Sequence, residues 1–259
     1  LSTVIYAQNT VGIILNSDQA YEGYNLVFPH NQSKVYLLDN CGQIVHLWED
    51  EDTFVPGNSV YLLNDGTLLK CKRGQMSGSN SPIWAGGGGE TVEVRNWDND
   101  LLYSFTLNDS LFRLHHDIEP LPNGNILMIA WELRTFEESI AAGRNPELMS
   151  QDKVWSEVIL EWNPMLDSIV WQWHVWDHLI QNFDRNKNNF GTPSRHPELI
   201  DLNYDEHDGH PDWLHINAID YNPVLDQIVM SVPYFNEFWI IDHSTTIEEA
   251  ASHTGGRSG

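Results

Sequence analysis

Basic residues are scarce in this chain. Its 259 residues include 13 Lys and Arg against 37 Asp and Glu, which gives a formal net charge of −24 with histidine neutral. A surface that binds phosphates needs a basic face, so nucleic acid is not expected as a partner. The same charge disfavours an anionic membrane surface. No apolar run approaches the ~18 residues of a membrane span, so no membrane partner is expected.

Cysteine is also nearly absent. Cys41 and Cys71 are the two in the chain. Two cysteines do not make a disulfide scaffold, and their separation matches no zinc motif. One bridge and two buried thiols both fit the sequence.

Several catalytic motifs are missing. There is no Gly-x-Ser-x-Gly elbow, and both cysteines lie outside the histidine-rich segments. The glycine run at residues 86–89 lacks a following Lys-Ser or Lys-Thr, so we interpret it as a flexible turn rather than a phosphate site. We expect no cofactor.

A folded β protein is what the remaining composition favours. Hydrophobic residues make up 41% of the chain and 11 are tryptophan, far too apolar for a disordered coil. Short β-branched and aromatic runs alternate with Asn-Gly and Asp-Gly turns, the signature of hairpins. The fold class predicted is therefore all-β.

The strand pattern also repeats. Gly66 and Gly124 lie 58 residues apart (124 − 66), and Trp48 and Phe105 lie 57 apart (105 − 48). A repeat of this length, built from about four short strands, is typical of a β-propeller. We count about four such units, which begin near residues 35, 61, 120 and 215.

Three parts of the chain are distinguished by composition. Residues 1–8 are a short apolar run ending in small or polar residues, interpreted as a signal-peptide remnant; an ordinary first strand is the alternative. Residues 9–259 are predicted to form a partial β-propeller belonging to a longer secreted protein. Within it, about 176–213 is a polar, acidic, histidine-rich loop insertion, and short helices are expected at 134–149 and 175–183.

The sharpest chemical signal comes from two histidine segments. His116 and His215 each stand near the start of a repeat's inner strand. Inner strands of a propeller line one central channel, so these two residues are predicted to meet although they are 99 positions apart (215 − 116). Asn217 follows His215 by two, which places both on one face of a strand. Imidazole and amide groups side by side offer a proton carrier and a neutral donor to one ligand.

Other histidines have weaker claims. His115 is interpreted either as a ligand contact or as a structural histidine packed between blades. The loop histidines, His196, His207 and His210, lie among acidic residues, where a metal site and a solvated loop are both conceivable. Residues 184–191 faintly resemble a calcium loop, but the glycine falls at position eight rather than six. We predict no metal.

Four strings of residues resemble a known family. They are residues 22–26, 36–42, 115–118 with 122–127, and 215–219, of which the His-x-Asn-Ala block at 215–218 is the most specific. They resemble the bacterial arylsulfotransferase (aryl-sulfate sulfotransferase) family over nearly the whole chain, from about residue 9. The resemblance implies a secreted or periplasmic six-bladed β-propeller with its site on the central axis. It also implies sulfuryl transfer from an aryl sulfate to a phenolic acceptor, without a nucleotide sulfate donor, through a transient sulfohistidine.

Site residues follow from the same resemblance. His116, or its neighbour His115, matches the family's first channel histidine, and His215 with Asn217 matches its His-x-Asn pair. The resemblance thus implies His116, His215 and Asn217 as catalytic residues and His115 as substrate-binding. Small-molecule aryl sulfates and phenols are the partners expected, and the oligomeric state is left open.

The chain departs from the family pattern at two points. Pro233 stands where family members commonly carry an arginine, which removes a fixed sulfate-binding charge. The family's histidine nucleophile is expected in a later blade, beyond Gly259. A non-catalytic secreted propeller that binds a ligand or glycan through a tryptophan-rich channel is therefore the alternative function.

Overall fold

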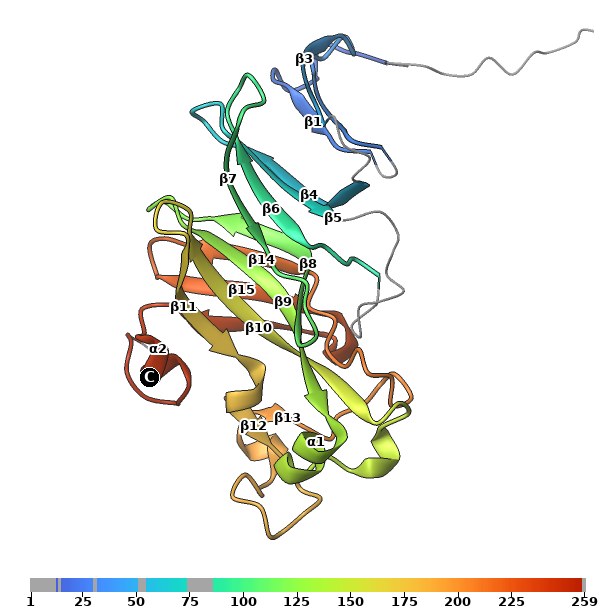
Figure 1. Ribbon diagram of the computed structural model, residues 1–259, viewed down its shortest axis with the longest axis vertical. Helices are drawn as coiled ribbons and strands as arrows, with labels where there is room; N and C mark the ends of the chain where they lie inside the picture. Colours follow the sequence, from blue (N-terminus) through green and yellow to red (C-terminus); the bar gives the residue numbers. More distant parts are fainter. Residues whose placement is uncertain (1–12, 14, 30–31, 51–54, 74–85, 258–259) are drawn as a thin grey trace, which may run out of the picture.

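The chain folds into a succession of antiparallel sheets. The computed structural model describes residues 13, 15–29, 32–50, 55–73 and 86–257, so the predicted signal remnant at 1–8 lies outside the described residues. Four antiparallel sheets follow one another along the described part, with a short parallel pair at one end (Figure 1). The all-β prediction is confirmed.

Within each of these four sheets, strands adjacent in sequence pair with one another. The first sheet contains β1 (Asn25–Val27), β2 (Lys34–Leu38) and β3 (Ile44–Glu49). The second contains β4 (Val55–Leu62), β5 (Leu68–Arg73), β6 (Thr91–Arg95) and β7 (Leu101–Thr106). The third contains β8 (Phe112–Pro120), β9 (Ile126–Thr135), β10 (Lys153–Asn163) and β11 (Ser168–His174). The fourth contains β14 (Ala218–Asn222), β15 (Gln227–Val232) and β16 (Glu237–Asp242).

A glycine turn closes one hairpin in each of the first three sheets. Gly42, Gly66 and Gly124 have φ values of +76°, +88° and +85°. In each turn the glycine N–H donates to the carbonyl three residues earlier, at 2.9 to 3.0 Å. Glycine reaches this left-handed conformation without steric cost, which explains the Asn-Gly and Asp-Gly periodicity of the sequence.

The apolar core lies between successive sheets. One cluster joins β2 and β3 to β5, the next joins β5 and β6 to β8, β9 and β10, and the largest joins β9, β10 and β11 to β14 and β15. Trp48 and Trp162 are completely buried in two of these layers. Each such side chain contributes roughly 1.5–3 kcal/mol through burial, so neighbouring sheets stabilise one another.

The first strands of three sheets lie together. β8 contacts both β4 and β14. Asp117 on β8 links them, since one carboxylate oxygen accepts the Tyr61 hydroxyl of β4 at 2.8 Å and the other accepts the backbone N–H of Ile219 on β14 at 3.2 Å. This row of strands carries the histidine segments.

Helical structure is short. The helix expected at 134–149 is reduced to α1 (Phe136–Ala142), because β9 continues to Thr135, and the 3-10 turn η1 (Pro146–Leu148) follows. Thr135 and Glu138 form a capping box at its start, and Gly143 ends it in the left-handed conformation. The second expected helix is wrong: 175–183 begins as the 3-10 turn η2 (Val175–His178) and continues as a strand.

The insertion at about 176–213 contains little regular structure. Its strands β12 (Leu179–Ile180) and β13 (Ile200–Asp201) pair in parallel, and η3 (Pro193–Arg195) lies between them. The chain then passes through β14 to β16, with η4 (Pro233–Phe235) between the last two strands, and on to α2 (Ile247–Ala250). No helix in the described ranges is long and apolar enough to cross a membrane.

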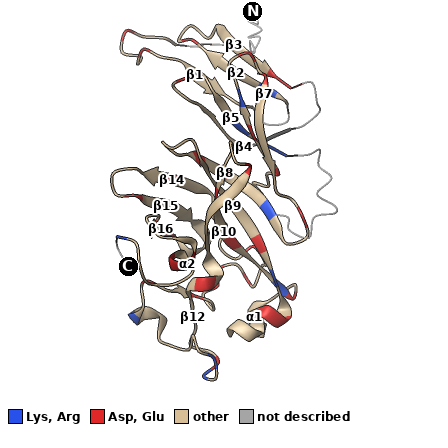
Figure 2. Cartoon of the chain, turned by 60° about the vertical axis from the view of Figure 1, so that its left-hand side comes forward, with Lys and Arg blue, Asp and Glu red and all other residues tan. Residues whose placement is uncertain are grey.

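Acidic residues are spread over the elements, and the first turns of α1 and α2 are both acidic (Figure 2). This placement complements the positive end of each helix dipole. Cys41 is exposed and Cys71 is buried, and neither forms a disulfide. Of the two alternatives for the cysteines, two thiols are correct, but only Cys71 is buried as expected.

A histidine joins the third and fourth sheets away from the core. His243, which follows β16, forms ion-pair contacts through Nε2 with Glu161 of β10 at 3.0 Å and through Nδ1 with Asp226 at 2.9 Å. Burial lowers the pKa of His243, but the hydrogen bonds to the two carboxylates more than offset this, so the pKa is raised. The protonated imidazole therefore holds the two sheets together.

We expect this contact to depend on pH. A histidine with a raised folded-state pKa stabilises fully below its unfolded pKa of about 6.5, and this stability is lost as pH rises through the folded value. His243→Gln should therefore reduce the free energy of unfolding by about 2 kcal/mol at pH 6 and by less at pH 8. Chemical denaturation at the two pH values measures the difference.

The matched control is His196→Gln, because His196 forms an exposed ion pair with Glu198. Exposed pairs contribute about 0–1 kcal/mol, so this variant should unfold almost like the parent protein. An equal loss at pH 6 and pH 8 for His243→Gln would show that the charge on His243 does not stabilise the fold.

Candidate functional site

The two histidine segments predicted to converge do meet. The ring centroids of His116 and His215 are 4.6 Å apart, with the rings nearly perpendicular. His116 lies inside β8, where the register breaks between Leu114 and Ile118, rather than before the strand as expected. His215 precedes β14, as expected.

Both histidines share an unusual backbone. His116 has φ +50° and His215 has φ +56°. This left-handed region is uncommon for residues other than glycine and costs roughly 1–2 kcal/mol, so the surrounding structure must hold it in place. The shared conformation supports the equivalence of the two segments.

An open cavity of about 400 Å³ lies beside His116. It is lined from β4 by Ser59, Val60 and Tyr61, from β8 by His116 and Asp117, and from the segment before β14 by Asn217. Three sheets therefore contribute to one cavity.

Asn217 is exposed toward solvent, while Ile216 beside it is completely buried and His215 is half-buried. The alternation expected from strand geometry thus holds at the level of burial, although β14 itself begins only at Ala218. Its side-chain amide and the His116 ring border the same cavity.

His215 is held by a carboxylate. Its Nδ1 lies 2.5 Å from one oxygen of Asp212, and the other oxygen accepts the indole N–H of Trp131 at 3.2 Å. The hydrogen bond to Asp212 raises the pKa of His215, although burial opposes this. Because Nδ1 is turned to Asp212, proton exchange at His215 takes place at Nε2.

His116 stands in the opposite environment. Its Nδ1 lies 2.9 Å from Nδ1 of His115, whose Nε2 lies 2.7 Å from a carboxyl oxygen of Glu157. Burial lowers the pKa of both His115 and His116 to about 3. Burial, aided by the charge of Asp212, raises the pKa of Glu157 well above its usual range. This arm of the site is therefore uncharged at neutral pH.

His115 lies behind His116. It is 3% exposed, its ring stacks on Trp131 with centroids 4.0 Å apart, and both its nitrogens are in contact with protein groups. The position predicted to bind substrate is thus a buried one, and the interpretation of His115 as a packed, hydrogen-bonded histidine describes it better.

Glu157 was not identified from the sequence. Its second oxygen accepts the backbone N–H of Ile216 at 2.9 Å, so one side chain of β10 joins both histidine segments. A signal was present, because Glu157 is the one charged residue in the mostly apolar stretch 154–160. A charged residue in such a strand is almost never buried without a partner.

The glycine run is likewise more than a turn. The backbone N–H of His116 donates to the carbonyl of Gly87 at 2.8 Å, and Gly88 forms a β-bridge with His115. Gly87 has φ +84°, and a Cβ added there would lie 2.1 Å from the His116 ring. Residues 86 and 87 do form a turn, as predicted, but the segment is held against β8 by these contacts, and its glycines allow the backbone to pack closely against the His116 ring.

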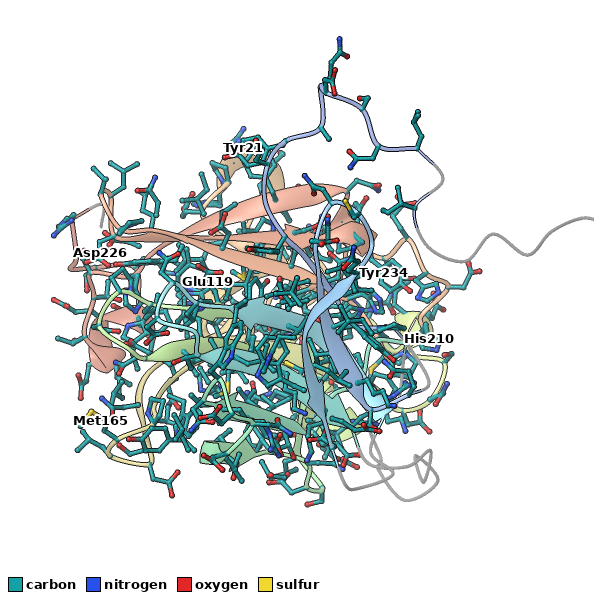
Figure 3. The ribbon with its side chains drawn as sticks, turned by 90° about the horizontal axis from the view of Figure 1, so that it is seen from above. Tyr21, Glu119, Met165, His210, Asp226 and Tyr234 are labelled. Carbon is teal, nitrogen blue, oxygen red and sulfur yellow. The ribbon has the colours of Figure 1, made fainter. Side chains whose placement is uncertain are left out.

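The loop histidines separate into two groups. His207 and His210 lie near Tyr234, whose ring centroid is 5.1 Å from that of His215. Tyr234 and His210 appear on one side of the view in Figure 3, and Asp226 on the opposite side. His196 instead borders a separate hollow of about 600 Å³ beside β16. No three His, Cys, Asp or Glu side chains in the described part of the chain are arranged to hold a metal ion.

Pro233 begins η4, directly before Tyr234. Arg113 of β8 is buried and donates from Nε to the carbonyl of Gly89 at 3.1 Å, so it supports the glycine run. Within the histidine pair, His215 is the side chain whose pKa is raised, through its hydrogen bond to Asp212.

The chain matches a known protein family. The family model described as Arylsulfotransferase (ASST) matches residues 7–248. No curated protein sequence matches the chain.

The position of His116 should depend on Gly87. Gly87→Ala places a methyl group against the imidazole and strains a left-handed backbone, so we expect the His116 ring to move and the free energy of unfolding to fall by about 1–3 kcal/mol. Imidazole chemical shifts and chemical denaturation measure the two effects.

Gly86→Ala is the matched control, because a Cβ at position 86 meets nothing within 4 Å. It should leave the His116 resonances in place. Unchanged resonances in Gly87→Ala as well would mean that the glycine run does not position the ring.

Proposed function

The chain belongs to the arylsulfotransferase family, whose model matches residues 7–248, and we propose that it transfers a sulfuryl group from an aryl sulfate to a phenolic acceptor. Both substrates are small molecules. The meeting of His116 and His215 beside a cavity that Asn217 also borders carries this proposal.

His215 and Asn217 are assigned to the sulfuryl group. During transfer, this group spreads negative charge over three oxygens, which cationic and amide donors stabilise. Asp212 keeps His215 protonated to higher pH, and Asn217 adds a neutral donor. His116, which is neutral, is assigned to the proton that a phenol releases or takes up.

The finer features of the family belong to the same proposal. The sheets act as blades of a six-bladed β-propeller, of which this chain supplies about four, and the row of β4, β8 and β14 faces the central axis. The reaction passes through a sulfohistidine, whose nucleophile we do not assign to any residue of this chain. We place the enzyme in the periplasm or outside the cell and assign it no cofactor.

The direct test is turnover of a chromogenic aryl sulfate with a phenol acceptor by the intact protein. Loss of one donor to a developing oxyanion costs about 100-fold or more in rate, so His215→Ala and Asn217→Ala should each lower kcat by that much. His196→Ala serves as control, because His196 lies on the other hollow. Equal turnover by the parent protein and His215→Ala would remove His215 from the mechanism.

Pro233 supports a second candidate function. Without an arginine at that position, the site has one fixed cation fewer to bind a sulfate. Such a loss is compatible with a module that binds a ligand without transferring a sulfuryl group. A secreted propeller that binds a ligand or glycan without turnover would take up an aryl ligand in equilibrium dialysis and release no phenol. That result would replace the enzyme proposal.

The role of Asp212 predicts a change in pH dependence. Asp212→Asn removes the charge that raises the pKa of His215, so that burial dominates and the pKa falls. If protonated His215 stabilises the sulfuryl group, activity declines as pH rises through this pKa, and the variant should lose activity at lower pH than the parent protein. A pH series of kcat measures the displacement.

Asp208→Asn is the control, since Asp208 is exposed in the same loop. Its alkaline limb should coincide with that of the parent protein. An Asp212→Asn profile without displacement would contradict protonated His215 as the group that controls the rate.

A further inference from the structure

We propose that Glu157, His115 and His116 form a proton relay that gives a proton to the departing phenol and recovers it from the acceptor. The proposal deepens the sulfuryl transfer proposed above and rests on it. It assigns Glu157, which does not touch the cavity, as the store of the proton, and His115 as the connection to His116.

The three groups form one continuous chain of hydrogen-bonding atoms. Glu157 Oε2 lies 2.7 Å from His115 Nε2, and His115 Nδ1 lies 2.9 Å from His116 Nδ1. Glu157 is 0% exposed and His115 3%, whereas His116 borders the 400 Å³ cavity. Among the described residues, no hydrogen bond occupies His116 Nε2. The chain thus runs from the interior to the one nitrogen left for a ligand.

The order of the protons along the chain follows from its atoms. Glu157 Oε1 accepts the Ile216 N–H, which leaves Oε2 to carry the proton of the buried acid. Oε2 then donates to His115 Nε2, so His115 carries its own hydrogen on Nδ1. That hydrogen is donated to His116 Nδ1, so His116 carries its hydrogen on Nε2. In the resting site, His116, which borders the cavity, therefore carries its hydrogen on the ring nitrogen that has no hydrogen-bond partner among the described residues.

Each half-reaction transfers one proton along the relay. In the first, the sulfur–oxygen bond of the aryl sulfate breaks with its electron pair to the aryl oxygen, and the sulfuryl group passes to the nucleophile. The aryl oxygen takes the Nε2 hydrogen of His116, which regains one at Nδ1 from His115, which in turn receives one at Nε2 from Glu157. Glu157 ends as a carboxylate and the first product as a neutral phenol.

The second half-reaction reverses the order. The acceptor phenol gives its hydrogen to His116 Nε2, and the chain returns a proton to Glu157 while the phenol oxygen takes the sulfuryl group. No proton is exchanged with solvent over the full cycle. This matters because the site otherwise has to protonate a leaving phenolate from water.

The charged groups around the relay favour a proton on Glu157. Asp212 and His215 face it from the segment before β14, and Arg113 faces His115 from β8. Asp212 is hydrogen-bonded to His215, and Arg113 contacts Gly89 and Glu90, so these charges have their own partners. A carboxylate at position 157 would lie close to Asp212 in the interior, which favours the acid form.

Glu157→Gln tests the relay directly. The amide NH₂ can donate to His115 Nε2 and the amide oxygen can accept the Ile216 N–H, so the hydrogen bonds persist, but the amide cannot release a proton. For phenyl sulfate, whose leaving phenolate needs a proton, we expect kcat/KM to fall by about 100-fold. For p-nitrophenyl sulfate, whose leaving group is stable as an anion, the fall should be below about threefold.

Glu161→Gln is the matched control. Glu161 is also a buried acid of β10 paired with a histidine, but the histidine is His243, outside the site. This variant should change both donors by the same small factor. A Glu157→Gln variant that loses equal activity with both donors would reduce Glu157 to a structural role and overturn the relay.

A second measurement does not depend on activity. In the ¹⁵N-labelled protein at neutral pH, the relay requires a hydrogen on Nδ1 of His115 and on Nε2 of His116, and the same arrangement in Glu157→Gln. A hydrogen on Nε2 of His115 in the parent protein would mean an ionised Glu157 and would overturn the proposal. If these tautomers are found but no aryl sulfate is turned over, the proposed function fails while the proton arrangement stands.

Discussion

The site depends on one buried carboxyl group. Glu157 of β10 holds the side chain of His115 through one oxygen and the backbone of Ile216 through the other. These contacts join the third sheet to the segment that carries His215 and Asn217. A buried acid without partners would cost several kcal/mol, so the two histidine segments and Glu157 are stable only together. The meeting of His116 and His215 is a consequence of that constraint.

The surroundings of two imidazoles in contact shift their pKa values in opposite directions. His215 is hydrogen-bonded to the carboxylate of Asp212, which favours its cationic form. His116 instead contacts the buried ring of His115, and burial favours its neutral form. Separation of pKa values by environment is how one site supplies both charge stabilisation and proton transfer. Trp131 contributes to both arms, because its face packs on His115 and its N–H binds Asp212.

Local patterns in the sequence predict the sheets well. The glycine turns at Gly66 and Gly124 and the alternation around them give the strands, and equivalent positions in the repeats bring His116 and His215 together. What pattern reasoning missed lies in tertiary contacts. The role of Glu157 depends on His115, 42 residues away in the sequence, and the role of Gly87 depends on its close packing against the His116 ring. The expected helix at 175–183 failed for a similar reason, because pairing with β13 outweighs local preference there.

The residues that line the cavity come from different sheets. Ser59, Val60 and Tyr61 come from β4 of the second sheet, whereas His116 and Asp117 come from β8 of the third sheet and Asn217 from the segment before β14. Val60 has no part in the hydrogen-bonded network, so its size can change while the network keeps its geometry. If the proposed sulfuryl transfer takes place in this cavity, the fit of the acceptor and the chemistry performed on it are encoded in different stretches of sequence. Selection could then change the range of phenols accepted without changing the hydrogen-bonded network.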